Sequence, residues 1–187
     1  MNPQSEGFFA DWFGFSVAGT GDKAIVGARN EAPEGFFNSG AAYVFDSTTG
    51  ELMLSLASPR LQTNGRFGRT VAGVQGNVLV GAEGETAGDL NFVGAVYLFD
   101  GDTGRLLLDI PHPEPSGFDL FGHYVARFWK NILVSAPGDG AVYVFRGVPE
   151  PDTFTGVVIS AMMLFFFAVV RGKGRQPTIH RDSVSHS

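Results

Sequence analysis

The side chains best suited to chemistry are acids in two irregular stretches of the sequence. Glu31 and Glu34 lie in the first stretch, and Glu83, Glu85 and Asp89 lie in the second. Their carboxylate oxygens could ligate Ca²⁺, which takes about six to eight oxygen ligands. The acids are irregularly spaced and differ between the two stretches, which favours solvated loops. We therefore expect no cofactor, with calcium at the second stretch as the alternative.

Other catalytic signatures are missing from the sequence. The four histidines are scattered without a metal-ligand spacing, and we expect each to be a loop or surface residue: His112, His123, His180 and His186. There is no nucleophile elbow, and Glu31 with Glu34 is too generic a carboxylate pair to nominate for acid–base catalysis. The sequence therefore predicts a protein that is not an enzyme.

The charge distribution along the chain argues against one class of binding partner. Residues 1–150 carry 9 Lys and Arg against 17 Asp and Glu, a balance of −8, whereas residues 171–187 carry 4 against 1, a balance of +3. An acidic body without a basic stripe argues against nucleic acid, because phosphate binding requires clustered Lys and Arg. The chain has no cysteine, so no disulfide framework is available.

Three units repeat along the chain at a 54-residue period. A run beginning with Phe-Gly opens each unit, at residues 13–18, 67–72 and 121–126. A second, apolar run covers residues 24–28, 78–82 and 132–136, and a third covers 40–46, 94–100 and 140–146. A fourth run, at 49–56 and 103–110, closes only the first two units. The acidic stretches lie between the second and third runs.

These runs predict an all-β fold, since each is short, rich in Val, Leu, Tyr and Phe, and bounded by turn residues. The second and third runs are apolar almost throughout, which is typical of strands covered on both faces. Radially stacked four-stranded sheets, as in a β-propeller, provide that cover. We predict a partial β-propeller of three four-stranded antiparallel blades, 13–66, 67–120 and 121–147, the third incomplete, with residues 1–12 as a linker from a missing blade. A β-sandwich with coincidental periodicity is the alternative.

The Phe-Gly pairs at 13–14, 67–68 and 121–122 are followed by Val-Gly-Ala or Val-Ser-Ala-Pro and then by Gly-Ala-x-Tyr-x-Phe segments. This pattern, over roughly residues 7–147, resembles the FG-GAP repeats of integrin α-subunit propellers and many bacterial surface proteins. The resemblance implies a seven-bladed propeller for adhesion or ligand binding, often with calcium in an Asp-rich loop between the first two strands. Here the corresponding loops, residues 19–23, 73–77 and 127–131, lack alternating Asp and Asn.

An uncharged stretch of 17 residues runs from Phe154 to Val170. As a helix it would span roughly 25 Å, near the lower limit for crossing a bilayer, so we expect one C-terminal transmembrane helix in contact with membrane lipid over residues 154–170. A buried strand or core helix is the alternative. Arg171, Lys173 and Arg175 follow, and the positive-inside rule then predicts a single-pass membrane protein with extracytoplasmic repeats and a basic cytoplasmic tail, residues 171–187.

The linker before this stretch, residues 148–153, contains Val148, Pro149, Glu150 and Pro151. Followed by an apolar span and a basic cluster, this motif resembles the PEP-CTERM sorting signal of Gram-negative bacteria. The resemblance implies an exosortase-type processing enzyme as a partner, and release or transfer to the cell surface after processing. A stiff linker is the alternative interpretation of the two prolines.

The sequence predicts a non-enzymatic cell-surface or exported binding or adhesion scaffold that presents loops 29–38 and 83–91 to a protein or polysaccharide ligand. The alternatives are a fragment of a propeller hydrolase and a purely structural surface or biofilm protein. The first residues lack the features of a signal peptide, and three units are fewer than the seven of the family's ring. We therefore expect either the C-terminal part of a longer product or a ring assembled from several chains.

Overall fold

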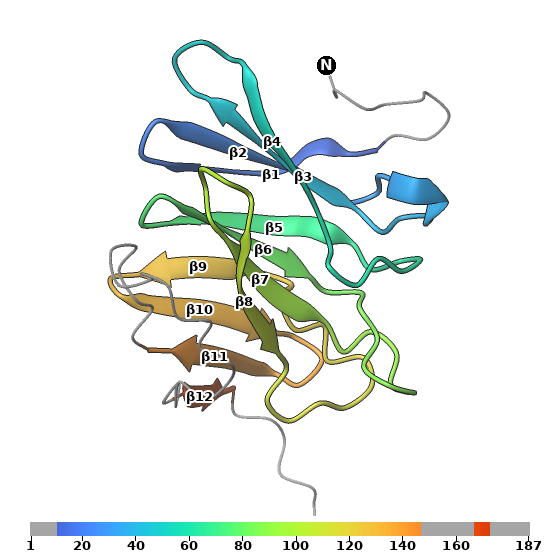
Figure 1. Cartoon of the computed structure of the whole chain (residues 1–187). Helices are drawn as coiled ribbons and strands as arrows, with labels where there is room; N and C mark the ends of the chain where they lie inside the picture. The colour runs from blue at the N-terminus through green and yellow to red at the C-terminus, as the bar shows by residue number, and fades with distance from the viewer. Residues whose placement is uncertain (1–10, 147–166, 173–187) are drawn as a thin grey trace, which may run out of the picture.

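The computed structural model describes residues 11–146 and 167–172, which form three four-stranded antiparallel sheets (Figure 1). Sheet 1 contains β1 (Phe13–Thr20), β2 (Lys23–Ala28), β3 (Ala41–Asp46) and β4 (Leu52–Ala57), with the 3-10 helix η1 (Pro33–Gly35) between β2 and β3. Sheet 2 contains β5 (Phe67–Val74), β6 (Asn77–Ala82), β7 (Ala95–Phe99) and β8 (Leu106–Pro111). Sheet 3 contains β9 (Val125–Phe128), β10 (Asn131–Ala136), β11 (Ala141–Phe145) and β12 (Phe167–Arg171).

The Phe-Gly pair that opens a unit produces a bulge in the first strand of sheets 1 and 2. The register shifts between Phe67 and Thr70 in β5, and β1 has the same irregularity. Gly68 has a φ of +80°, which side-chain-bearing residues rarely adopt, and an added Cβ would overlap the backbone oxygen of Ala41 in sheet 1. Glycine is therefore required where neighbouring sheets approach, while the ring of Phe67 is fully buried beside it.

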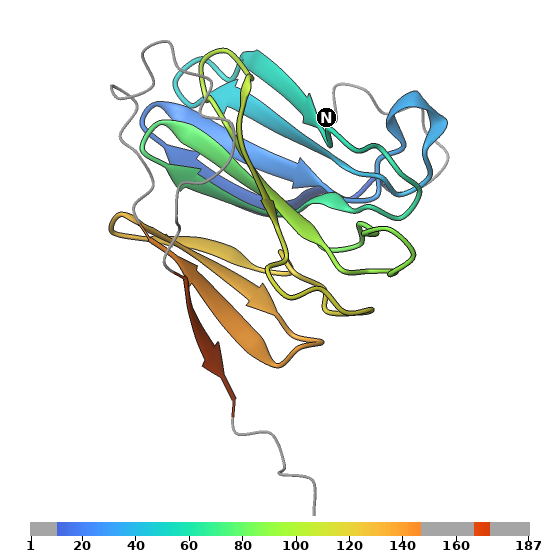
Figure 2. The ribbon, with the colours of Figure 1, turned by 60° about the horizontal axis from the view of Figure 1, so that its bottom comes forward.

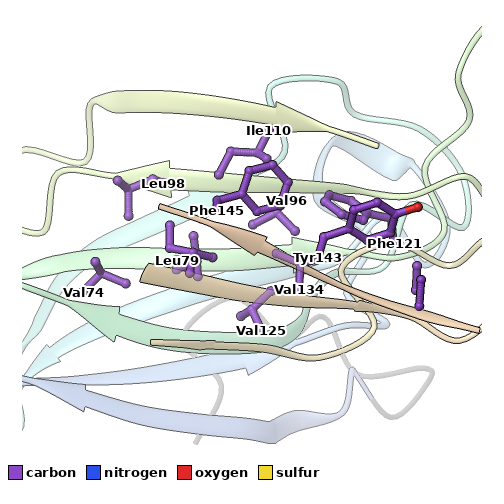
Figure 3. Packing of buried hydrophobic residues seen from close by; sticks show 13 residues of the cluster. Val74, Leu79, Val96, Leu98, Ile110, Phe121, Val125, Val134, Tyr143 and Phe145 are labelled. Carbon is purple, nitrogen blue, oxygen red and sulfur yellow. The ribbon is translucent and has the colours of Figure 1, made fainter. Parts of the chain in front are cut away.

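The three sheets stack face to face, with sheet 2 in the middle (Figure 2). One buried cluster lies between sheets 1 and 2: Ile25, Ala42, Val44, Leu56, Phe67, Val78, Val80, Tyr97 and Phe99. A second lies between sheets 2 and 3 (Figure 3): Leu79, Val96, Leu98, Ile110, Phe121, Ile132, Val134, Tyr143 and Phe145. Neighbouring residues of β6 and β7 point to opposite clusters, which explains why these runs are apolar throughout.

Sheet 3 differs from the prediction of an incomplete third unit. Its fourth strand is β12, which pairs with β11 from Ala141 opposite Arg171 to Phe145 opposite Phe167. Val169 packs against the cluster between sheets 2 and 3, whereas Val170 is exposed. The last residues of the apolar stretch thus give one face to the core and their backbone to the edge of β11.

The prediction of a C-terminal transmembrane helix over residues 154–170 is therefore wrong. Phe167 to Val170 are extended strand residues, and no helix within residues 11–146 and 167–172 is long and apolar enough to cross a membrane. The single-pass topology fails with it, because Arg171 is the last residue of β12 and lies beside Glu114, 3.1 Å away, and Asp139, 3.8 Å away. Length and hydropathy alone did not distinguish a spanning helix from a strand that completes a sheet.

Several other predicted features lie in parts of the chain that the structure does not describe. Val148, Pro149, Glu150 and Pro151 of the sorting motif, together with Lys173 and Arg175, lie outside the described residues. So does most of the leading linker, residues 1–12, of which residues 11 and 12 are described.

Candidate functional site

Irregular segments from all three sheets gather at one end of the strands, on the right in Figure 1. We call this end the loop face and define it by the loops after β2, β6 and β10, residues 29–40, 83–94 and 137–140, and by the linkers at residues 58–66 and 112–124. The two-residue turns at 21–22, 75–76 and 129–130 lie at the opposite end.

Backbone hydrogen bonds hold the loops after β2 and β6 to the linkers that follow them. The amides of Asn64, Arg66 and Phe67 donate to Phe37, Asn38 and Ser39 over 2.7 to 3.0 Å. One period later, the amides of Phe118, Leu120 and Phe121 donate to Asn91, Phe92 and Val93 over 2.8 to 3.0 Å. The loop face is therefore an ordered surface, since its peptide groups are paired across the sheet boundaries.

A repeated acid and tyrosine pair stiffens each loop. Tyr43 donates its hydroxyl to Glu31 over 2.5 Å, Tyr97 donates to Glu85, and Tyr143 donates to Asp139. Burial, together with the hydrogen bond to Asp139, raises the pKa of Tyr143 to about 12. Burial likewise raises the pKa of Glu85, against the lowering effect of hydrogen bonds from Ser58 and Tyr97. These carboxylates are structural acceptors in the loop face.

The residues that follow the last strands of sheets 1 and 2 reach the acid of the next sheet. Ser58 donates its hydroxyl to Glu85. His112, one period later, places Nε2 3.9 Å from a carboxylate oxygen of Asp139 and 3.7 Å from one of Asp119. The imidazole is buried between sheets, so His112 lies in a loop segment, as expected, but it is not a surface residue. Burial lowers its pKa, although both aspartates oppose the shift.

The loop face also holds a charged centre at Glu83, which is buried. Its carboxylate accepts hydrogen bonds from Arg66 Nη1 over 3.2 Å and from Arg69 Nε over 3.0 Å, and a third from His123 Nδ1. Arg69 Nη2 lies 3.0 Å from His123 Nε2. Because a guanidinium can only donate, that imidazole nitrogen accepts and Nδ1 carries the proton to Glu83. His123 therefore takes part as a neutral ring.

Arg29 completes this centre from sheet 1. Its Nη1 lies 3.9 Å from Glu83, beyond hydrogen-bonding distance, and its buried Nε has no hydrogen-bond partner. The guanidinium lies 4.4 Å from the ring centroids of both Trp12 and Phe15, and that of Arg69 lies 4.7 Å from Phe15. Contacts of cations with ring faces contribute about 0.5–2 kcal/mol, depending on how dry the site is.

The acids predicted as possible calcium ligands are thus divided among different networks. Glu83 faces guanidinium groups, Glu85 faces Ser58 and Tyr97, and Asp89 is exposed in the loop after β6. Among residues 11–146 and 167–172, no three His, Asp or Glu side chains gather so as to hold a metal ion. Calcium at these acids stays a prediction.

The sequence of the first unit is similar to a known repeat family. Residues 4–45 match the FG-GAP repeat family. The matched segment includes β1, β2 and β3, and the second and third units repeat its strand order. No curated protein matches the chain.

Sequence reasoning missed two features that repeat alignment reveals. Glu31, Glu85 and Asp139 are spaced by 54 residues, so the acids are regular where irregularity was expected. Arg29 and Glu83 also occupy equivalent positions, as do Phe15, Arg69 and His123. The charged centre therefore consists of positions where the repeats differ in residue type.

Proposed function

We propose that the chain is a non-catalytic binding or adhesion scaffold of the FG-GAP type and that the loop face holds its ligand. The observation that carries this proposal is the stacking of three sheets, which brings loops from different repeats to one end and ties them together by backbone hydrogen bonds. Binding residues commonly lie on loops that a rigid framework positions.

The side chains of the loop face support this role. Phe37 is 49% exposed and Phe118 is 63% exposed, although both lie in segments whose backbone is hydrogen-bonded. Phe118 stacks on Phe92 with ring centroids 5.5 Å apart. Exposed aromatic rings that are already ordered lose little conformational freedom on binding, and aromatic and arginine side chains dominate the energetics of protein interfaces.

The opposite end of the strands provides a matched control. Phe128 is 58% exposed, a fraction similar to that of Phe118, but it lies at the turn between β9 and β10. Loss of a ring there removes a similar exposed apolar area without touching the loop face. A comparison of substitutions at the two positions therefore separates binding at the loop face from nonspecific hydrophobic binding.

The experiment begins with a screen of the immobilised full chain against a panel of polysaccharides and extracellular matrix proteins, followed by titration of the best binder. We expect Phe118→Ser to weaken that binding by at least about tenfold, the loss of an ordinary interface hot spot, and Phe128→Ser to leave it unchanged. Equal losses in both variants, or a loss in Phe128→Ser alone, would contradict the proposal.

A further inference from the structure

We propose that Arg29, Arg66 and Arg69 form a recognition site for the carboxylate of an acidic saccharide. This inference rests on the proposed function and specifies the ligand class that the loop face accepts. It starts from a charge imbalance at one point of the surface, although the chain as a whole carries a formal net charge of −6.

The charge at this point is not balanced by Glu83. Three guanidinium groups lie within 4.0 Å of that one carboxylate, at 3.0, 3.2 and 3.9 Å. In the part of the chain that the structure describes, no other carboxylate lies within salt-bridge distance of these three side chains. Because His123 is neutral in its hydrogen-bonding arrangement, the centre carries two positive charges in excess. A bound anion would neutralise part of that excess.

Arg29 is the group best placed to receive the anion. Arg66 and Arg69 each donate to Glu83, whereas Arg29 stands 3.9 Å away with Nε buried and unpartnered. Burial, followed by the charges of Arg69 and Arg66, lowers the pKa of Arg29. A guanidinium that is not hydrogen-bonded to Glu83 and lies in a positive environment is a site where a carboxylate adds a charge-assisted hydrogen bond.

Aromatic rings surround the same guanidinium groups and are open to solvent. Trp12 is 45% exposed, Phe15 is 36% exposed and Tyr124 is 60% exposed. Arg29 lies over the first two rings, and Arg69 lies 5.4 Å from the centroid of the third. Flat apolar surfaces beside a carboxylate-binding fork suit a ligand that combines an apolar ring face with one acid group, and a uronic acid has that composition.

Charge density favours a saccharide over an acidic peptide. The body of the chain is acidic, so a ligand with closely spaced carboxylates would be repelled outside the local positive centre. In a saccharide that contains uronic acid, each carboxylate is separated from the next by a sugar ring. We therefore commit to this class and treat an acidic peptide as an outcome of the test.

The test is calorimetric titration of the full chain at pH 7 with trigalacturonic acid, its methyl ester and triglutamate as probes. We expect the free acid to bind, the ester to bind at least about tenfold more weakly, and a rise in salt from 50 to 200 mM to weaken binding of the acid because salt screens the guanidinium charges. Arg29→Gln is expected to raise the Kd of the acid by about tenfold or more. Arg105→Gln, an exposed arginine at the opposite end of the strands, is the control for lost charge and should leave the Kd unchanged.

A second variant, Arg66→Gln, covers the case in which Arg29→Gln does not fold, because the Arg66 side chain is 34% exposed and more tolerant of change. Three results would overturn the inference: equal binding of acid and ester, tighter binding of triglutamate, or binding of the acid that is absent or unaffected by these substitutions. None of these results touches the comparison of Phe118→Ser with Phe128→Ser, so the proposed function is judged separately.

Discussion

Substitution of Gly73 by alanine tests the stacking of sheet 1 on sheet 2. An added Cβ at Gly73 would overlap the backbone oxygen of Gly19 in sheet 1 and lie 2.6 Å from Thr20 Cβ. Gly19 is the equivalent residue of sheet 1, and its own Cβ would meet only Lys23 O, at 3.6 Å. Both glycines are strand residues without positive φ, and each pairs with a residue of the next strand. Gly19→Ala is therefore a closely matched control.

The expected magnitude follows from these contacts. Overpacking costs about 1–3 kcal/mol, and the upper end applies here because a backbone oxygen cannot rotate away. Replacement of glycine by alanine also restricts the unfolded chain, which stabilises by about 0.4–1 kcal/mol. We expect Gly73→Ala to lose about 2–3 kcal/mol and Gly19→Ala to be neutral or up to about 1 kcal/mol more stable.

The assay is urea unfolding of both variants, followed by circular dichroism and tryptophan fluorescence. A slope of about 2 kcal/mol per molar urea turns the expected loss in Gly73→Ala into a midpoint shift of about 1–1.5 M. Midpoints of the two variants that agree within about 0.3 M would refute the stacking, since the two sites differ mainly in the neighbouring sheet.

Three further substitutions probe other parts of the structure. Tyr97→Phe removes a hydrogen-bond donor from buried Glu85 and should lower the free energy of unfolding by about 1–3 kcal/mol in urea titrations, whereas a change below about 0.5 kcal/mol would argue against that bond. A double variant, Ala168→Pro with Val169→Pro, should speed amide hydrogen exchange in β11. Alternate residues of β12 hydrogen-bond to β11, so one of the two prolines must remove a backbone hydrogen bond between these strands. Unchanged exchange would argue against the pairing of β12 with β11. His112→Ser should flatten the decline of stability between pH 7 and pH 5.5, measured as urea midpoints.

The sign of that pH dependence follows from the lowered pKa of His112. Because the folded state favours the neutral ring, its contribution is present above the unfolded value of about 6.5 and is lost as the pH falls toward the lower folded value. Protonation would also end the hydrogen bond from the Glu114 amide to Nδ1, now 3.1 Å long. The raised pKa of Glu85 acts in the opposite sense, since the folded state then favours the protonated carboxyl and gains stability as the pH falls through the folded pKa of that group. An identical slope in wild type and His112→Ser would contradict the assignment.

The repeat accounts for most of the fold that could be predicted. Repeated runs, most of them spaced by 54 residues, indicated the strands from β1 to β11 and the sheet boundaries. The runs of β6 and β7 are apolar throughout because these two strands are covered on both faces. β12 could not be read in this way. Its place depends on a tertiary contact with the edge of β11, and its sequence has no counterpart at the repeat spacing.

The sequence indicated which loops contain the candidate site, but not the contacts that its side chains make. Glu83 was identified as an acid in a loop after a strand, but its role depends on Arg66, Arg69 and His123, which the repeat brings from other segments. A search for residues that the repeats share does not find such a cluster, because the cluster forms at positions where the repeats have different residues. The neutral state of His123 follows only from its two neighbours in space.

Hydrogen exchange measured with and without a saturating acidic saccharide tests the role of the loop face most directly. With trigalacturonic acid bound to the full chain, we expect slower exchange in residues 29–40, 58–69 and 83–94, and no change in the turns at 47–51 and 100–105. Protection confined to those turns, or no protection in any of these segments, would contradict the account.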